Sequence, residues 1–205
     1  MPDLFEYDKE LRAKGFAFIA GVDEAGRGPL AGPVVAAAVI LPEKVNVNID
    51  EINDSKKLSP QTREKLAAEI KRTAVDWSVG LATVQEIAYL NIHGASLLAM
   101  RRAVQSLATV PHCVIVDGRF LIPDLALTQY AVTGGDGLSA SIAAASILAK
   151  VTRDHLMQLF QHIYPDYGFA RHKGYATALH LEKLAVFGPC PLHRAGFQPV
   201  KRLPK

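Results

Sequence analysis

Short apolar runs alternate along the chain with longer stretches in which apolar residues recur every three or four positions. Runs of four to eight apolar or β-branched residues bounded by turn signals predict strands. The second run, Val34 to Leu41, contains no polar residue, which is typical of a strand buried on both faces. The predicted strands cover residues 16–23, 34–41, 77–82, 113–117 and 128–133.

Helical spacing predicts a long helix over residues 139–163, and the first half of this helix is apolar all round, so we expect it to be deeply buried. Ser59 followed by Pro60 is a good helix start, and Thr83 with Glu86 matches a capping box. The other predicted helical segments are a short helix or arm within 1–15, a helix with Leu66, Ile70 and Ala74 on its buried face, a short helix opening at Thr83, a separate helix from about Ser96 to Leu107, and a short helix over 178–187.

Strands that alternate with helices after an opening pair of strands indicate an α/β fold with a mixed central sheet flanked by helices and a helical C-terminal part. The chain has 205 residues, of which 49% are hydrophobic and 21% charged. This composition is sufficient for a full core. No interdomain linker is evident, so we expect one domain over residues 1–205.

The net charge of +3 is mild, but its distribution is uneven. Residues 171–205 contain seven Lys or Arg and one acid, a net of +6, which leaves −3 for the first 170 residues. A basic segment over about 165–205 on a mildly acidic body suggests a grip on a polyanion. On charge alone, a solvated basic tail is an equally good explanation.

Two distant cysteines, Cys113 and Cys190, form no CxxC pair, which argues against a zinc site and fits a reducing compartment. The N-terminus has no secretory leader pattern, and no apolar run reaches the ~18 residues of a membrane span. We therefore expect a cytoplasmic protein, without a membrane partner and monomeric; its protein partners are unknown at this point.

Acids follow apolar strands or stand beside glycines at three separated places, as Asp23 with Glu24, Asp117 and Asp136. Val-Ile-Val-Asp-Gly delivers Asp117 to the carboxyl end of a strand, where α/β sheets carry their sites. Four converging carboxylates without a His or Cys partner are hard oxygen ligands, which suit Mg²⁺ or Mn²⁺. Two such ions about 4 Å apart suit the attack of water on a phosphodiester.

Each acid also has a structural explanation. Asp136 is well placed to cap the helix that starts near Ser139, and a turn before Gly118 explains Asp117 as well as a ligand role does. The adjacent pair Asp23 and Glu24 is harder to explain structurally, because two neighbouring carboxylates behind an apolar strand are costly to bury.

Three further segments are candidates for nucleic-acid contacts. The turn Gly26-Arg27-Gly28 combines exposed backbone N–H groups with a positive charge, which suits a phosphate or a sugar hydroxyl. Ser55, Lys56 and Lys57 offer phosphate contacts, although a solvated charge pair explains them equally. The segment Tyr167 to Tyr175 interleaves aromatic and basic residues, which is a stacking pattern, with ordinary surface packing as the alternative.

Other kinds of site lack their motifs. No G-x-x-x-x-G-K-[ST] and no G-x-S-x-G is present, and Gly26-Arg27-Gly28 runs into Pro29, so the turn is a poor dinucleotide fingerprint.

An ordered set of motifs resembles the type 2 ribonucleases H over roughly residues 17 to 202. The set is Asp-Glu-Ala-Gly-Arg-Gly-Pro, Asn-Asp-Ser-Lys-Lys-Leu-Ser, Val-Asp-Gly, Ser-Ile-Ala-Ala-Ala-Ser-Ile-Leu-Ala-Lys-Val-Thr-Arg-Asp and His-Lys-Gly-Tyr-Ala-Thr. The chain length is similar to that of bacterial ribonuclease HII and not ribonuclease HIII.

The resemblance implies a ribonuclease H-like fold and an endonuclease that cuts the RNA strand of RNA–DNA hybrids. It also implies cutting on the 5′ side of a ribonucleotide embedded in duplex DNA, which leaves a 3′-hydroxyl and a 5′-phosphate.

By motif, the resemblance also assigns roles to individual residues. Gly26, Arg27 and Gly28 read the 2′-hydroxyl, and Tyr175 packs on the following deoxyribose. The remaining assignments are Asp23, Glu24, Asp117 and Asp136 as metal-binding catalytic acids, and Ser55, Lys56 and Lys57 as phosphate contacts.

Two positions depart from the pattern of these relatives. Gly134 stands where relatives often have lysine, and Gly196 stands where relatives often have serine. Each change puts one substrate contact in doubt, and neither touches a carboxylate. The alternatives to a ribonuclease are another metal-dependent nuclease or a transposase on the same fold, and a noncatalytic nucleic-acid-binding module.

Overall fold

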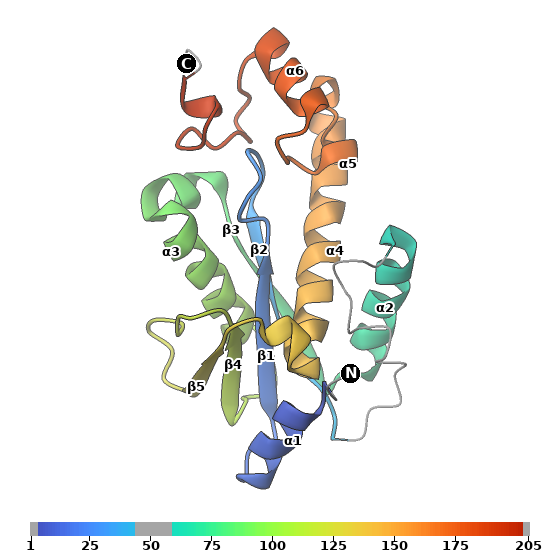
Figure 1. Ribbon diagram of the computed structural model, residues 1–205, viewed down its shortest axis with the longest axis vertical. Coiled ribbons are helices and arrows are strands. Elements are labelled where there is room, and N and C mark those ends of the chain that lie inside the picture. Colours follow the sequence, from blue (N-terminus) through green and yellow to red (C-terminus); the bar gives the residue numbers. More distant parts are fainter. Residues whose placement is uncertain (1–3, 44–58, 203–205) are drawn as a thin grey trace.

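A five-stranded mixed sheet forms the centre of the molecule (Figure 1). The computed structural model describes residues 4–43 and 59–202. Strand β1 pairs antiparallel with β2 and parallel with β4, β2 pairs antiparallel with β3, and β4 pairs parallel with β5. The order across the sheet is β3 (Asp76–Ala82), β2 (Val34–Ile40), β1 (Ile19–Ala25), β4 (Cys113–Asp117) and β5 (Thr128–Val132). The predicted mixed sheet is thus confirmed.

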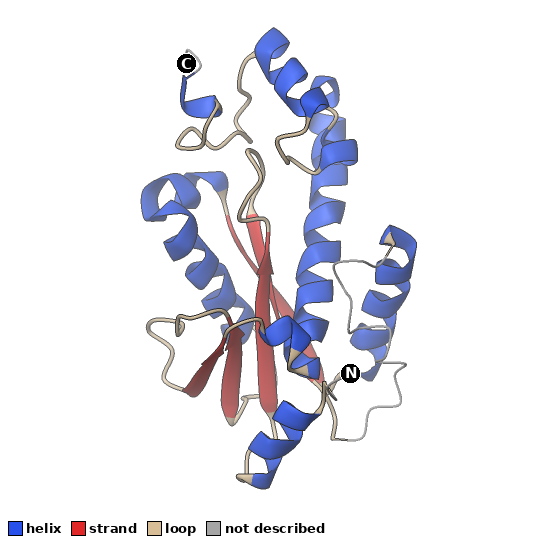
Figure 2. Cartoon of the chain, viewed as in Figure 1, coloured by secondary structure: helices blue, strands red, loops and turns tan. Residues whose placement is uncertain are grey.

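Helices cover both faces of this sheet (Figure 2). Helix α3 (Val84–Gln105) packs on one face, and α4 (Ala140–Ile163) with α2 (Pro60–Thr73) packs on the other. Helix α1 (Glu6–Ala13) lies at one end of the sheet, and α5 (Phe169–His172) and α6 (Ala178–Phe187) lie at the opposite end. Short 3₁₀ turns cover Gly135–Gly137, Pro165–Tyr167 and Val200–Arg202. Within the described ranges, no helix is both long enough and apolar enough to cross a membrane.

Strand β2 is buried on both faces, as its apolar sequence predicts. Ala36 and Ala38 belong to the core beneath α3, whereas Ala37 and Val39 belong to the core beneath α4. Successive side chains of a strand point to opposite faces, so β2 contributes to both cores. Small alanine side chains let both helix layers approach the sheet closely.

The helix starts follow the capping signals in the sequence. The Ser59 hydroxyl accepts a hydrogen bond from the Thr62 amide at 3.1 Å. Thr83 and Glu86 form the predicted capping box, with amide-to-side-chain distances of 3.2 and 2.8 Å. Helix α4 begins after Ser139, whose hydroxyl accepts from the Ile142 amide at 3.2 Å.

Two expected boundaries differ from the structure. The helical segments expected to be separate around Ser96 form one element, α3, with a kink at Asn91. Asn91 has φ 60° and its side chain accepts from the amides of His93 and Gly94, so it ends one half and caps the next. The first strand begins at Ile19 rather than Phe16, and extends to Ala25.

The C-terminal segment packs directly on the loop between β1 and β2. The Leu30 amide donates to the Gly174 carbonyl at 2.8 Å, and the Arg194 amide donates to the Leu30 carbonyl at 2.8 Å. Ala31 forms an isolated bridge with His193. These bonds join the end of the chain to the turn that follows the first two acids.

Candidate active site

Strand pairing brings the acids of β1 and β4 to one edge of the sheet. Val22 is the partner of Val116 in the parallel ladder, so Asp23 and Asp117 follow side by side. Strand alternation turns Asp23 toward α4 and its neighbour Glu24 toward the opposite face. Asp23 and Asp117, which belong to separate sequence motifs, thus meet because β1 and β4 are hydrogen-bonded neighbours.

Gly21 fixes the distance between this edge and helix α4. A Cβ atom at Gly21 would lie 2.1 Å from the backbone carbon of Ser141. Glycine therefore allows the first turn of α4 to lie directly on β1. This close approach sets where the next turns of α4, which carry Ser146 and Lys150, stand relative to Asp23.

A cavity of about 430 Å³ opens at this edge. It contains five of the eight predicted site residues that the structure describes, together with three polar side chains that were not predicted. Its lining consists of Asp23, Glu24, Ala25, Gly26, Arg63, Asp117, Ser146, Ile147, Lys150 and Tyr175. Acids from two strands, a helix face and an exposed aromatic ring therefore share one concave surface.

Asp23 is the most deeply buried of the four candidate metal-binding acids, with 7% of its surface exposed. Burial raises the pKa of Asp23 well above its usual range, and the nearby charges of Glu24 and Asp117 raise it further. Hydrogen bonds from the Glu24 amide, at 2.7 Å, and from the Ser146 side chain act in the opposite direction. The site therefore crowds negative charge that a bound cation would compensate.

Glu24 and Asp117 are each held by one defined contact. The Glu24 carboxylate pairs with the Arg27 guanidinium at 2.9 Å, with 8% of the Glu24 side chain exposed. The Asp117 carboxylate accepts a hydrogen bond from the Gly135 amide at 2.7 Å. Asp136 follows Gly135 in a 3₁₀ turn and is half-buried, but it is outside the lining of the cavity. Its ligand role stays a prediction.

The donors in the cavity are carboxylate oxygens, which are the ligands that Mg²⁺ and Mn²⁺ prefer. In the parts of the chain that the structure describes, no three His, Cys, Asp or Glu side chains are already gathered tightly enough to hold a metal ion. The chemistry of Asp23, Glu24 and Asp117 fits a divalent cation.

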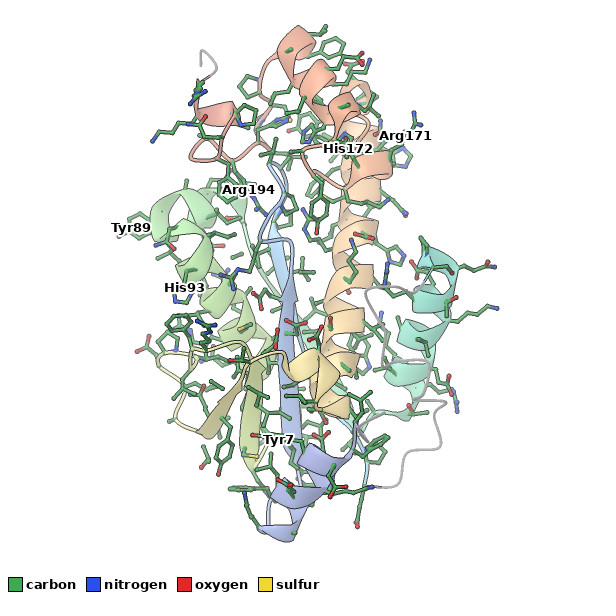
Figure 3. All side chains as sticks on the ribbon, viewed as in Figure 1. Tyr7, Tyr89, His93, Arg171, His172 and Arg194 are labelled. Carbon is green, nitrogen blue, oxygen red and sulfur yellow. The ribbon has the colours of Figure 1, made fainter. Side chains whose placement is uncertain are left out.

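The turn after the acids is built around two buried arginines. Gly26 has φ +100°, and a Cβ there would lie 2.1 Å from Nε of Arg153, so only glycine fits. Arg194 is 1% exposed and donates to the carbonyls of Gly26 at 2.6 Å and Arg27 at 2.9 Å. It also donates to Pro29 at 2.8 Å and to Gly32 at 2.8 and 3.0 Å. Figure 3 shows Arg194 beside this loop.

Tyr175 lines the same cavity as the acids and lies next to the turn. Its ring is 4.0 Å from the position that a Cβ of Gly28 would take, and 43% of the residue is exposed. The ammonium group of Lys150 lies 5.6 Å from the ring centroid, and the guanidinium of Arg153 lies 5.9 Å from it. An exposed ring therefore stands over the space between the turn and helix α4.

Comparison with known proteins gives a consistent result. The family model for ribonuclease HII matches residues 20–200. The chain belongs to the ribonuclease HII family. It is 61% identical over 198 residues to ribonuclease HII of Pelotomaculum thermopropionicum, which covers 97% of this chain and 74% of the relative. It is 52% identical over 195 residues to ribonuclease HII of Syntrophotalea carbinolica, which covers 95% of this chain and 92% of the relative.

A solved structure supports the same assignment. The crystal structure of ribonuclease H2 from Pyrococcus horikoshii superposes with a TM-score of 0.72 at 28% identity, and the match covers 90% of this chain and 96% of that one. The fold is therefore ribonuclease H-like, as predicted. As a ribonuclease H, the protein is an endonuclease that acts on RNA–DNA hybrids, and its family depends on divalent metal ions.

Some ribonuclease HII motifs contribute differently than the sequence suggested. In the segment Tyr167 to Tyr175, Tyr167 is 7% exposed and Phe169 is fully buried, so neither ring is available to stack on a nucleic acid. The predicted stacking role of this segment is wrong for both rings, because they fill the core between α4 and α6. Ser55, Lys56 and Lys57 lie outside the described residues.

Sequence reasoning missed the polar side chains that α4 and α2 give to this ribonuclease HII cavity. Ser146 and Lys150 are four residues apart, so they share a face of the helix. That spacing within an apolar helix was the signal that could have revealed them. Arg63 and the buried Arg153 had no comparable signal, because their roles depend on where the loops come to lie.

Proposed function

We propose that this ribonuclease cuts the phosphodiester on the 5′ side of a ribonucleotide embedded in duplex DNA, leaving a 3′-hydroxyl and a 5′-phosphate. The observation that carries the proposal is one cavity lined by Asp23, Glu24, Asp117, Gly26 of the turn and Tyr175. Acids that hold the cation, a turn that reads the ribose and a ring that reads the next sugar would then act on adjacent parts of one strand.

Asp23, Glu24 and Asp117 are the proposed metal ligands, with Mg²⁺ or Mn²⁺ as the ion. Asp136 joins them as a fourth, because its neighbour Gly135 already contacts Asp117 at 2.7 Å. When bound, divalent ions in such a site activate the attacking water and stabilise the leaving oxygen. The burial of Asp23 among other carboxylates supports this role, since the crowded charge needs a cation.

The Gly26-Arg27-Gly28 turn is the proposed reader of the 2′-hydroxyl. The Arg194 guanidinium donates hydrogen bonds to the carbonyls of Gly26 and Arg27, so both carbonyls point toward it. In a trans peptide the N–H points opposite to the C=O, so the amides of Arg27 and Gly28 point away from Arg194. Among the described residues, neither amide has a hydrogen-bond acceptor. Two directed N–H donors next to the acids suit a sugar hydroxyl.

Tyr175 is the proposed reader of the sugar after the ribonucleotide. Its exposed ring stands beside Gly28, so a nucleotide whose 2′-hydroxyl meets the turn would place its 3′ neighbour near the ring. A deoxyribose packs closely on an aromatic face, whereas an added 2′-hydroxyl would have to be desolvated there. The ring would therefore favour RNA-to-DNA junctions.

Basic residues around the cavity are proposed to bind the backbone. Arg63 and Lys150 line the cavity, and Lys150 is oriented by Asp154 at 2.7 Å. Ser55, Lys56 and Lys57 are proposed as further phosphate contacts, and the exposed Arg171, Lys201 and Arg202 as the gripping part of the basic C-terminal segment. The guanidinium of Arg194, in contrast, is buried and donates its hydrogen bonds to the carbonyls of the turn.

One gel tests the proposed activity. A DNA duplex with a single ribonucleotide is incubated with the enzyme in Mg²⁺, in Mn²⁺ or in EDTA. We expect a single cut 5′ to the ribonucleotide with at least one metal and no cut in EDTA. Absence of that cut with both metals would overturn the proposal.

A variant pair tests the role of Tyr175. Tyr175→Ala should reduce cutting at the single ribonucleotide more than cutting of an all-RNA strand paired with DNA. Tyr89→Ala is the matched control, because Tyr89 is 90% exposed and lies on α3, outside the lining of the cavity. Equal losses on the two substrates would remove Tyr175 from junction recognition.

A further inference from the structure

Three buried imidazoles lie beneath Tyr175. His172 comes from α5, His180 from α6 and His193 from the segment after α6, and they are 7%, 0% and 5% exposed. The rings of His172 and His180 are stacked with centroids 4.2 Å apart, and Phe169 packs against all three (His172 is labelled in Figure 3). None of them lines the cavity or touches the acids.

The proton positions in this cluster follow from the Tyr175 carbonyl. Nδ1 of His180 is 2.9 Å from this oxygen, which can only accept, so His180 carries its proton on Nδ1. In a neutral ring, Nε2 of His180 is then an acceptor. Its partner is Nε2 of His193 at 3.1 Å, which must therefore donate.

The same assignment holds at the other end of the chain of bonds. With its proton on Nε2, His193 accepts at Nδ1, and the Cys190 amide donates to that atom at 3.0 Å. The Cys190 carbonyl is farther from Nδ1, at 3.3 Å, and already accepts from the His193 amide at 2.9 Å. Burial, and then the proximity of His180, lowers the pKa of His193 to about 4, so the ring is neutral at pH 7.

A second set of bonds fixes the residue before Tyr175. The Gly174 amide donates to Nδ1 of His172 at 3.1 Å, and Nε2 of His172 lies 2.8 Å from the Tyr167 carbonyl. The Tyr175 amide donates to the carbonyl of His172 at 2.9 Å. The Tyr175 carbonyl accepts two hydrogen bonds, one from the Thr177 amide at 2.8 Å and one from Nδ1 of His180 at 2.9 Å. His180 is therefore the side chain that ties this carbonyl to the histidine cluster.

We propose that His193 is a positioning residue for Tyr175: by donating to His180 it fixes the His180 tautomer that binds the Tyr175 carbonyl, and so it sets selectivity for the RNA-to-DNA junction without touching the substrate. The proposal rests on the proposed role of Tyr175. His193 lies one residue before Arg194, which orders the sugar-reading turn. Adjacent residues of one segment would therefore place both readers of the sugars.

The kinetic test compares His193→Phe with His193→Gln. Phenylalanine keeps the ring shape and removes the donor, whereas glutamine keeps an N–H donor near the position of Nε2. For each variant, kcat and KM are measured on a duplex with one ribonucleotide and on an RNA–DNA hybrid. We expect His193→Phe to lower the ratio of the two kcat/KM values about tenfold, the effect of one buried hydrogen bond, and His193→Gln to keep it within about twofold.

Phe169→Leu is the matched packing control, since Phe169 contacts the same rings but takes no part in the bonds. The ratio should be unchanged in this variant. In a Tyr175→Ala background, His193→Phe should lower the ratio no further. An equal loss of the ratio in Phe169→Leu, or a further full loss in the double variant, would overturn the proposal.

Nitrogen-detected NMR of the wild-type imidazoles provides a test that needs neither substrate nor a folded variant. The expected result is His180 protonated on Nδ1 and His193 on Nε2 at pH 7. A proton on Nε2 of His180 would overturn the proposal even if the enzyme cuts at embedded ribonucleotides. Failure of the wild-type enzyme to cut there would instead count against the proposed function alone.

Discussion

The contact between Gly21 and helix α4 predicts a large effect of one added methyl group. In Gly21→Ala the new Cβ would lie 2.1 Å from the backbone carbon of Ser141 and 2.3 Å from the Ile142 amide. Carbon atoms pack best at about 3.5–4.0 Å, so α4 and β1 must separate by roughly 1.5 Å. Both clashing groups are backbone, so no side chain can rotate away to relieve them.

The cost of this separation can be worked out from packing. Overfilling a close-packed core costs about 1–3 kcal/mol, and a gap of roughly 50 Å³ opened elsewhere beneath α4 adds about 1 kcal/mol. Gly21 has an ordinary backbone conformation. Alanine at this position therefore stabilises the folded state by about 0.4–1 kcal/mol, because it restricts the unfolded chain. The expected net loss in the free energy of unfolding is about 2–3 kcal/mol.

Urea-induced unfolding followed by circular dichroism measures this loss, and the melting temperature should fall by roughly 4–12 °C. Gly196→Ala is the matched control, because a Cβ there meets nothing within 4 Å, and it should change stability by less than about 0.5 kcal/mol. The displaced α4 also carries Ser146 and Lys150 away from Asp23, so kcat should fall by up to about 100-fold. A Gly21→Ala variant as stable as the wild type would refute the packing argument.

Three other predictions concern charge. Asp117→Asn should lower the cleavage rate by at least about 10³-fold. Substrate binding should survive, because asparagine still accepts a hydrogen bond from the Gly135 amide. Undiminished cleavage would exclude Asp117 from the metal site. Wild-type stability should fall as the pH drops from about 6.5 to about 4, because the unfolded chain binds a proton at His193 before the folded one does. His193→Gln should reduce that slope by up to about 1.4 kcal/mol per pH unit, and an unchanged slope would contradict burial of a neutral ring. Hydrogen bonds from Arg102 lower the pKa of Glu86 to about 2. Because the pair is partly exposed to solvent, Glu86→Gln should lower the free energy of unfolding by no more than about 1 kcal/mol at pH 7, and this loss should fade as the pH falls from about 4.5 toward 2. A loss that persists at low pH would refute the ion pair.

Local signals in the sequence determined most of the elements. The apolar run of β2, the capping box at Thr83 and the start of α4 after Ser139 needed no tertiary context, because each depends on residues within one turn or one strand. A break within residues 83–107 was expected, but the second helix was expected to start near Ser96, whereas the break lies at Asn91 within one element, α3. The position of the break depends on a single asparagine side chain that caps the second half of α3.

The sequence also identified Asp23, Glu24, Asp117 and Tyr175, because these residues stand in motifs or at strand ends. Only the tertiary structure decided that they share one cavity, since strand order β2-β1-β4 places Asp23 beside Asp117. Only the tertiary structure also showed that the rings of Tyr167 and Phe169 are buried whereas that of Tyr175 is exposed. The local pattern of aromatic and basic residues is the same around all three rings. Burial depends on what packs against a residue, and that packing comes from distant segments.

Arg194 shows the difference most clearly. By sequence it is one more charge in a basic tail, and by structure its guanidinium organises the carbonyls of the turn between β1 and β2. The sequence around His193, next to it, carries no signal of the buried hydrogen bonds that this ring makes with His180 and Cys190. Local patterns determine which residues can form a strand, a cap or a charged surface, whereas the partner of a buried polar group depends on which backbone the folded chain brings to it.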